Sequence, residues 1–220
     1  MDEIVVVWGA YSTRVDGSRH LDWAVRAATG LKITTVRGCR SCGSVEHGAP
    51  YLADGWDAYM GCSVTHVTGF ILAAISLRRN RDGSLRRGPL PVGIDAEAIT
   101  APDPDLATAL ADRVLDASEY GRLRSRTPQE FERELLTAWT QKEATLKAMG
   151  SGLLIDPRRV ETEPICSDRC RVRVCVPGAE GTFLARSVNS AGHSRSWVGS
   201  VATPDVPRAH RASLRIVRVE

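Results

Sequence analysis

The chain has 220 residues, of which 43% are hydrophobic and 25% charged, with a formal net charge of +3. This composition excludes a disordered chain, and no apolar run reaches the roughly 18 residues of a membrane-spanning helix. The small net charge gives no argument for nucleic-acid binding, and the acidic, strand-like start lacks the basic segment of a signal peptide. We therefore expect a cytoplasmic protein that binds neither nucleic acid nor a membrane.

The first part of the chain is rich in short apolar segments separated by glycine and polar turns. These segments predict strands around a single helix before residue 88. The expected elements are strands at 3–10, 32–36, 63–67 and 69–77, and a helix at 21–29. The strand at 69–77 is almost entirely apolar, so it is expected at the centre of a sheet.

The second part begins with a strand and two helical segments and then becomes rich in β-branched residues. The expected elements are a strand at 92–97, helices at 106–117 and 127–149, and strands at 170–176, 183–188, 196–202 and 214–219. The order of helix and strands before residue 88 is weakly repeated after it. We therefore divide the chain into 1–88 and 89–220 and assign it to the α+β class.

The long helix ends in the segment Trp139 to Leu153, with Thr127 as an expected cap and Gly150 at its end. Glu143 and Lys147 are four residues apart, at the border of the apolar stripe. Two interpretations are open: an ordinary solvated ion pair, or two charges that line a cleft. Lys142 falls near the centre of the stripe, where a lysine must reach an anion or extend to solvent.

The strand at 92–97 ends in two acidic residues, Asp95 and Glu97, which are two apart and therefore share one face. Two neighbouring carboxylates repel each other unless a cation lies between them, and Mg²⁺ prefers such oxygen ligands together with phosphates. The alternative is a strand that runs into a polar loop. Thr65 and His66 precede the apolar strand at 69–77, and an isolated histidine is more often structural than functional.

Together these three segments resemble the Sfp-type 4′-phosphopantetheinyl transferases. That family carries a Ser-His element before an apolar strand, then Gly-(Val/Ile)-Asp-x-Glu, then Trp-x-x-Lys-Glu-x-x-x-Lys-x-x-Gly-x-Gly-Leu. The corresponding segments here are Thr65-His66, residues 93–97 and residues 139–153. Order and spacing both agree, and the last segment agrees at every fixed position.

The resemblance implies a monomer built as a pseudo-dimer of two similar α/β halves with antiparallel sheets, with coenzyme A between them. It implies transfer of 4′-phosphopantetheine from coenzyme A to a serine of an acyl or peptidyl carrier protein. The metal, Mg²⁺ or Mn²⁺, is expected on Asp95, Glu97 and Glu143, with Glu143 also accepting the serine proton. The residues expected to act in catalysis or to contact coenzyme A are Asp95, Glu143, Lys147, Thr65, His66, Lys142, Arg37 and Pro50.

The sequence departs from the family where a phosphate contact is expected. The family resembles Gly-Lys-Pro at the end of the loop at 37–50, whereas this chain has Ala49 in place of the lysine. Val67 also stands where the family has a small hydroxyl residue. Candidate replacements for the lysine are Arg37, Arg40 and His47, and candidates for the 3′-phosphate are Arg14, Arg19 and Arg26.

Two rival hypotheses come from other classes of protein. Cys39, Cys42 and His47, with Cys62 or His66 as a fourth ligand, suggest a zinc-stabilised nucleic-acid-binding module. This hypothesis leaves the three acids unexplained, and we expect no structural zinc. The other rival is a protein of the same fold that binds coenzyme A without turnover.

A basic loop at 78–88 carries five arginines: Arg78, Arg79, Arg81, Arg86 and Arg87. It lies between the strand after His66 and the strand that ends at Glu97. We therefore expect it to emerge beside the site and to contact an acidic carrier protein. The alternative is a solvated loop whose charges have no ligand.

Overall fold

The computed structural model describes residues 2–10, 17–39, 42–45, 48–99, 103–188, 197–206 and 212–219, and structural statements below concern these residues. Arg14, Arg40 and His47 lie outside them, and the side chain of Arg19 is not described. Their expected phosphate or metal contacts therefore stay predictions.

The first sheet contains the apolar strands of the first half and has the order β11-β1-β5-β4. Its strands and its helix are β1 (Asp2–Ala10), α1 (Gly17–Thr29), β4 (Met60–Val67), β5 (Phe70–Arg78) and β11 (Ser213–Val219). Alternate residues of β1 pack on opposite sides, because Val5 and Val7 meet α1 whereas Ile4 and Val6 meet the second sheet. Covering on both faces explains the uninterrupted apolar sequence of β1 and β5, and β5 is internal as expected.

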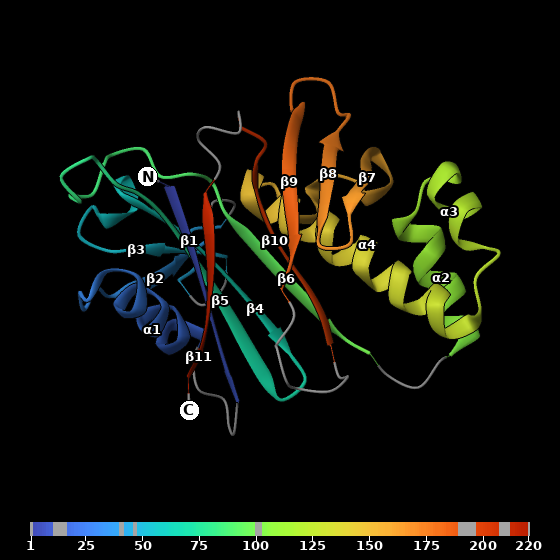
Figure 1. Cartoon of the computed structure of the whole chain (residues 1–220), viewed down its shortest axis with the longest axis horizontal. Helices are drawn as coiled ribbons and strands as arrows, with labels where there is room; N and C mark the ends of the chain where they lie inside the picture. The colour runs from blue at the N-terminus through green and yellow to red at the C-terminus, as the bar shows by residue number, and fades with distance from the viewer. Residues whose placement is uncertain are drawn as a thin grey trace.

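The second sheet has the order β6-β10-β9-β8-β7, and its neighbouring strands are antiparallel. Its strands are β6 (Gly93–Ala98), β7 (Val160–Cys166), β8 (Arg169–Val174), β9 (Gly181–Ser187) and β10 (Trp197–Pro204). Figure 1 shows the two sheets side by side. The α+β class with antiparallel sheets is confirmed, and the parallel pair β1–β11 is an exception to it.

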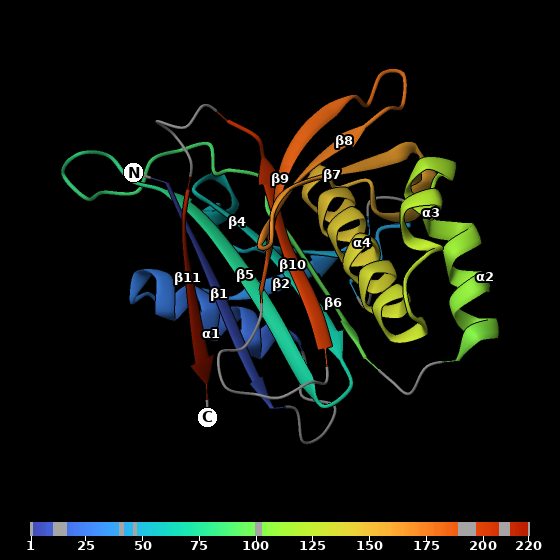
Figure 2. The same ribbon diagram turned by 45° about the vertical axis from the view of Figure 1, so that its right-hand side comes forward.

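Three helices accompany the second sheet: α2 (Pro104–Val114), α3 (Ala117–Leu123) and α4 (Pro128–Met149). Figure 2 shows α4 lying between this sheet and the pair α2 and α3. The helix expected at 106–117 is confirmed as α2, but it ends at Val114, and Asp116 caps a separate helix, α3, that was not predicted. No helix in the described part of the chain is long and apolar enough to cross a membrane.

Short elements complete the chain, and several were missed from the sequence. The loop expected at 37–50 contains parts of a hairpin, β2 (Thr35–Gly38) and β3 (Ala49–Leu52). Strand β7 was not predicted. The remaining elements are the 3₁₀ turns η1 (Trp56–Ala58), η2 (Gly152–Leu154) and η3 (Pro157–Arg159).

The two sheets meet where β4 lies against β6. The Ile94 amide donates to Ser63 Oγ at 3.1 Å, and a buried apolar cluster joins β1 and β5 to β6 and β10. Strand β11 returns to the first sheet, beside β1, although it follows the second sheet in the chain. This arrangement brings the ends of β4 and β6, with their polar residues, to one place.

Candidate active site

Helix α4 presents three candidate residues on one face, because Trp139, Glu143 and Lys147 are spaced by four. Its ends are strongly specified. Thr127 and Glu130 form a reciprocal capping box at the start, and Gly150 adopts a left-handed conformation (φ 72°) after the last turn. The register of the helix, and with it the position of the three side chains, is therefore fixed at both ends.

Gly93 allows β6 to lie unusually close to α4. A Cβ at this position would overlap the carbonyl oxygen of Ala144 and lie 2.6 Å from the amide nitrogen of Ala148. Only a glycine permits this approach of two backbones. The approach sets Asp95, two residues further along β6, against the side chain of Lys147.

Asp95 is the centre of the polar contacts. Lys147 Nζ donates to Asp95 Oδ1 at 2.7 Å, and Thr65 Oγ1 donates to the same oxygen at 3.0 Å. Asp95 is 4% exposed, and its other oxygen, Oδ2, is buried without a hydrogen-bond partner in the described structure. Burial raises the pKa of Asp95, although Lys147 and Thr65 act in the opposite direction.

Glu97 and Glu143 complete an acidic group around Asp95. Trp139 Nε1 donates to Glu97 Oε1 at 2.9 Å, whereas Glu143 Oε2 is buried and has no partner among the described residues. Burial is the largest cause that raises the pKa of each glutamate, and the charge of Asp95 raises both pKa values further. Among the described residues, Lys147 is the one cation whose charge lowers all three pKa values.

The donor atoms of this group fit a divalent cation in their chemistry. Three carboxylates with an excess of negative charge match the oxygen ligands of Mg²⁺, and two of their buried oxygens have no hydrogen-bond partner within the described ranges. The described residues do not yet form a ready-made group of three metal ligands. Oxygens of Asp95 and Glu97 accept from Lys147 and Trp139, so metal binding requires the remaining oxygens or a change of rotamer.

Thr65 and His66 are neighbours on β4 and therefore face opposite ways. Thr65 is buried against Asp95, whereas His66 is exposed on the other face. His66 interacts with His20 of α1, which sequence reasoning missed. His20 is buried, neither ring nitrogen has a described hydrogen-bond partner, and burial followed by the charge of His66 lowers its pKa. His20 and His66 lie on different elements that are far apart in the sequence. Their interaction is therefore visible only in the tertiary structure.

Arg37 and Pro50 face each other across the hairpin of β2 and β3. Arg37 Nη1 donates to the carbonyl of Gly48 at 3.2 Å. Arg37 and Pro50 both line a cavity of about 270 Å³. The structure thus brings these two candidates together at the border of one cavity. A second cavity, of about 400 Å³, is bordered by Glu97, Trp139 and apolar residues of α2 and α4.

Lys142 is not brought to the acidic group. Its side chain is fully buried and donates to Glu119 Oε2 at 2.6 Å and to the Val114 carbonyl at 2.7 Å. The apolar stripe continues across Lys142 because its ammonium finds these oxygens inside the protein. Lys142 does reach an anion, as expected for a lysine within an apolar stripe. The anion is the carboxylate of Glu119 and not a phosphate of a ligand.

The basic loop emerges at the wrong end of the strands for the expected contact. Thr65 pairs with Leu72 near the start of β5, whereas the loop begins after Arg78, about 20 Å further along the strand. Arg78 is paired with Asp2 at 3.2 Å and Arg79 with Glu3 at 3.9 Å. The argument that placed this loop beside the site is therefore wrong, because it followed the chain order and ignored strand direction.

The cysteines give the zinc hypothesis little geometric support. Burial raises the pKa of Cys62 to about 12, which disfavours the thiolate that zinc requires. Among the described residues no group of three or more metal-binding side chains occurs. Because His47 is outside them, our expectation of no zinc stays a prediction.

Comparison with known families gives one match. Residues 91–202 match the model of the family described as the 4′-phosphopantetheinyl transferase superfamily. The matched region covers just over half of the chain and contains Asp95, Glu97, Glu143 and Lys147. A search of curated proteins finds no match.

Proposed function

Because the chain belongs to the 4′-phosphopantetheinyl transferase superfamily, we propose that it transfers 4′-phosphopantetheine from coenzyme A to a serine hydroxyl of an acyl or peptidyl carrier protein. The other product is adenosine 3′,5′-bisphosphate. We assign the protein to the Sfp type, on the agreement of residues 93–97 and 139–153 with that pattern. The carrier protein and the pathway stay open.

The proposed architecture is the pseudo-dimer of this type, with halves 1–88 and 89–220. Two neighbouring sheets, one packed on α1 and one on α4, support it. The boundary at residue 88 does not separate the two sheets completely, because residues 213–219 (β11) pair with β1 of the first half. We further propose that the protein acts as a monomer in the cytoplasm.

The observation that carries the proposal is the charge imbalance at the end of β6. Among the described residues, Asp95, Glu97 and Glu143 share one cation, Lys147, and two of their buried oxygens have no hydrogen-bond partner. Such a group is unstable alone but suits a site that receives Mg²⁺ or Mn²⁺ and a diphosphate. A metal bound there supplies positive charge that stabilises the leaving phosphate.

The protein residues have separate proposed tasks. Asp95 and Glu97 hold the metal, and Thr65 keeps the Asp95 carboxylate oriented by its hydrogen bond. Lys147 contacts a phosphate oxygen, for which it must exchange part of its contact with Asp95. Glu143, with a free buried oxygen and a raised pKa, accepts the proton of the carrier serine and also binds the metal.

The coenzyme A contacts extend from this group to the first half of the chain. Arg37 and Pro50 border a cavity there, and the His66 side chain on β4 is exposed. We propose that His66 binds the 3′-phosphate and that Arg37 replaces the lysine missing at Ala49. Phosphate binding by Lys142 is not proposed, because its ammonium is already held by three protein oxygens.

Mass spectrometry of apo carrier proteins tests the proposal and identifies the substrate. A panel of fatty-acid, polyketide and nonribosomal-peptide carriers is incubated with the protein, coenzyme A and Mg²⁺. One carrier or more should gain the mass of one phosphopantetheine, and a chelator should prevent the gain. A carrier whose serine is replaced by alanine is the control. If no carrier gains this mass while coenzyme A still binds, the protein is a coenzyme A-binding protein without turnover.

A further inference from the structure

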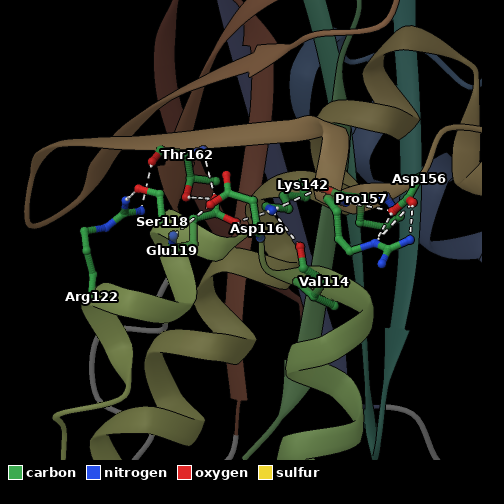
Figure 3. Close-up of polar contacts among 10 residues, drawn as sticks. Val114, Asp116, Ser118, Glu119, Arg122, Lys142, Asp156, Pro157 and Thr162 are labelled. Carbon is green, nitrogen blue, oxygen red and sulfur yellow. Dashed lines mark hydrogen bonds and ion pairs between the residues drawn. The ribbon is translucent and has the colours of Figure 1, made fainter.

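Lys142 and Glu119 form an ion pair in the interior of the second half. Lys142 is 0% exposed, and its Nζ donates to Glu119 Oε2 at 2.6 Å, to Val114 O at 2.7 Å and to Pro157 O at 3.1 Å. An ammonium has three protons, so every donor of Lys142 is used. Figure 3 shows the lysine with these acceptors around it.

Glu119 is as fully bonded as its partner. Its Oε2 also accepts from the amide of Asp116 at 3.0 Å, as part of the capping box that starts α3. Its Oε1 accepts from the amide of Thr162 at 3.0 Å and from Thr162 Oγ1 at 2.6 Å. A single carboxylate thus joins the start of α3, the helix α4 and strand β7 (Figure 3).

The acceptors of Lys142 come from three separate segments. Val114 is the last residue of α2, Glu119 belongs to α3, and Pro157 begins η3. A cation at the C-terminus of α2 is also favourable for the dipole of that helix. Burial lowers the pKa of Lys142, and Glu119 acts against this effect. Burying the ion pair therefore costs desolvation free energy. Its directional hydrogen bonds fix the position of α4 relative to the segments that supply the acceptors.

The feature of interest is the rotation of α4 about its own axis, which the Lys142–Glu119 ion pair can restrict. Lys142 directly precedes Glu143, and consecutive helical residues differ in direction by about 100°. A rotation of about 10° moves an atom about 5 Å from the helix axis by about 0.9 Å. Trp139 and Lys147 contact Glu97 and Asp95 on one side of α4, and Lys142 holds the helix from another side.

We propose that Lys142 is a positioning residue, whose ion pair with Glu119 fixes the rotation of α4 and so sets where Glu143 and Lys147 stand against β6. This inference rests on the proposed function, since it assigns a task within the same site. It differs from a direct contact with coenzyme A, which the sequence suggested for Lys142.

Steady-state kinetics of Lys142→Met and Glu119→Gln, two substitutions of similar size, test the inference. For both variants kcat should fall about 10- to 100-fold, because displacements of about 1 Å have effects of this size. The KM for coenzyme A should stay within about twofold of the wild type. The double variant Lys142→Met/Glu119→Gln should have a higher melting temperature than Lys142→Met, because it leaves no unpaired charge buried. Its kcat should stay low, because the ion pair is still absent.

Ile75→Ala is the matched control, because Ile75 is fully buried in the first sheet and remote from α4. It should lower the melting temperature and leave kcat unchanged at temperatures where it is folded. A rise in the KM for coenzyme A with unchanged kcat for Lys142→Met would identify a direct ligand contact and overturn the inference. Unchanged kcat and KM, or kcat that recovers together with stability in the double variant, would reduce the pair to a structural role.

Hydrogen exchange provides a measurement that does not depend on turnover. If no carrier is modified, the proposed function fails, but the inference about α4 is still tested. Lys142→Met should increase amide exchange in residues 139–149 and at Thr162 by more than its loss of global stability explains, whereas Ile75→Ala should increase exchange there only as far as it lowers the stability of the whole protein. Should exchange in α4 stay at the wild-type level in folded Lys142→Met, the ion pair does not control the position of that helix. Thr162→Val, which removes one hydrogen bond to Glu119, replaces Lys142→Met if the latter does not fold.

Discussion

Substitution of Gly93 by alanine is the sharpest perturbation that the fold offers. The added Cβ would lie 2.6 Å from the Ala148 amide nitrogen and 2.9 Å from the Ala144 carbonyl carbon, and would overlap the Ala144 oxygen. Ordinary contact begins at about 3.5 Å, so β6 and α4 must separate by about 1 Å. Both partners are backbone, and no rotamer change can relieve the overlap.

The separation should affect both stability and the site. Overpacking of this kind costs about 3 kcal/mol of unfolding free energy, at the upper end of its usual range. In a chain of this size that loss corresponds to a decrease in melting temperature of about 6–12 °C. The bond between Lys147 and Asp95 should lengthen with the separation, and transfer activity should fall about 100-fold.

Gly121→Ala is the matched control, because Gly121 lies inside α3 with nothing within 4 Å of an added Cβ. Alanine there should raise stability by about 0.5–1 kcal/mol through helix propensity. Urea denaturation followed by circular dichroism measures both changes. The reasoning about close approach is refuted if Gly93→Ala loses less than about 0.5 kcal/mol, or if both variants shift in the same direction.

Three other outcomes are expected. Asp95→Ala should remove transfer almost completely without unfolding the protein, as chelation of Mg²⁺ should, and unchanged turnover would rule out the proposed metal site. Burial raises the pKa of Asp95, Glu97 and Glu143, so the folded metal-free protein binds protons more tightly than the unfolded chain. Its unfolding free energy should therefore fall as pH rises from the ordinary carboxyl pKa values to the raised ones. In Asp95→Asn this decrease with pH should be smaller. An equal decrease in the two proteins would contradict the assignment of the pH dependence to Asp95. Replacing Arg86 and Arg87 with serine should leave both KM values unchanged, because the loop lies away from the site; a higher KM for the carrier protein would restore carrier docking by this loop.

Local patterns of the sequence were sufficient for the elements that carry the candidate site. The four-residue spacing of Trp139, Glu143 and Lys147 places them on one helix face, and Thr127 and Gly150 mark the ends of that helix. The two-residue spacing of Asp95 and Glu97 places them on one face of β6. These shared faces depend only on helix and strand periodicity, so they can be predicted from the spacing of residues in the sequence.

Contacts between distant segments could not be found in this way. The family resemblance led us to assign Lys142 to coenzyme A, and nothing near Lys142 along the chain suggests Glu119, which is 23 residues away. Thr65 and His66 were treated as one unit, although alternation along β4 places Thr65 against Asp95 and His66 on the opposite face. The basic loop was assigned to the site because chain order does not show at which end of a strand a loop emerges.

Residue types and spacing alone thus determined the helix face, the acidic pair and the family pattern, since those depend on backbone geometry over a few residues. The tertiary structure alone decided which charges meet. Only the packing of β6 on α4 at Gly93 brings Asp95 to Lys147, and only the meeting of α2, α3, η3 and β7 around α4 buries Lys142. The physical reason is that the desolvation and pairing of a charge depend on every segment packed around it, however distant in sequence.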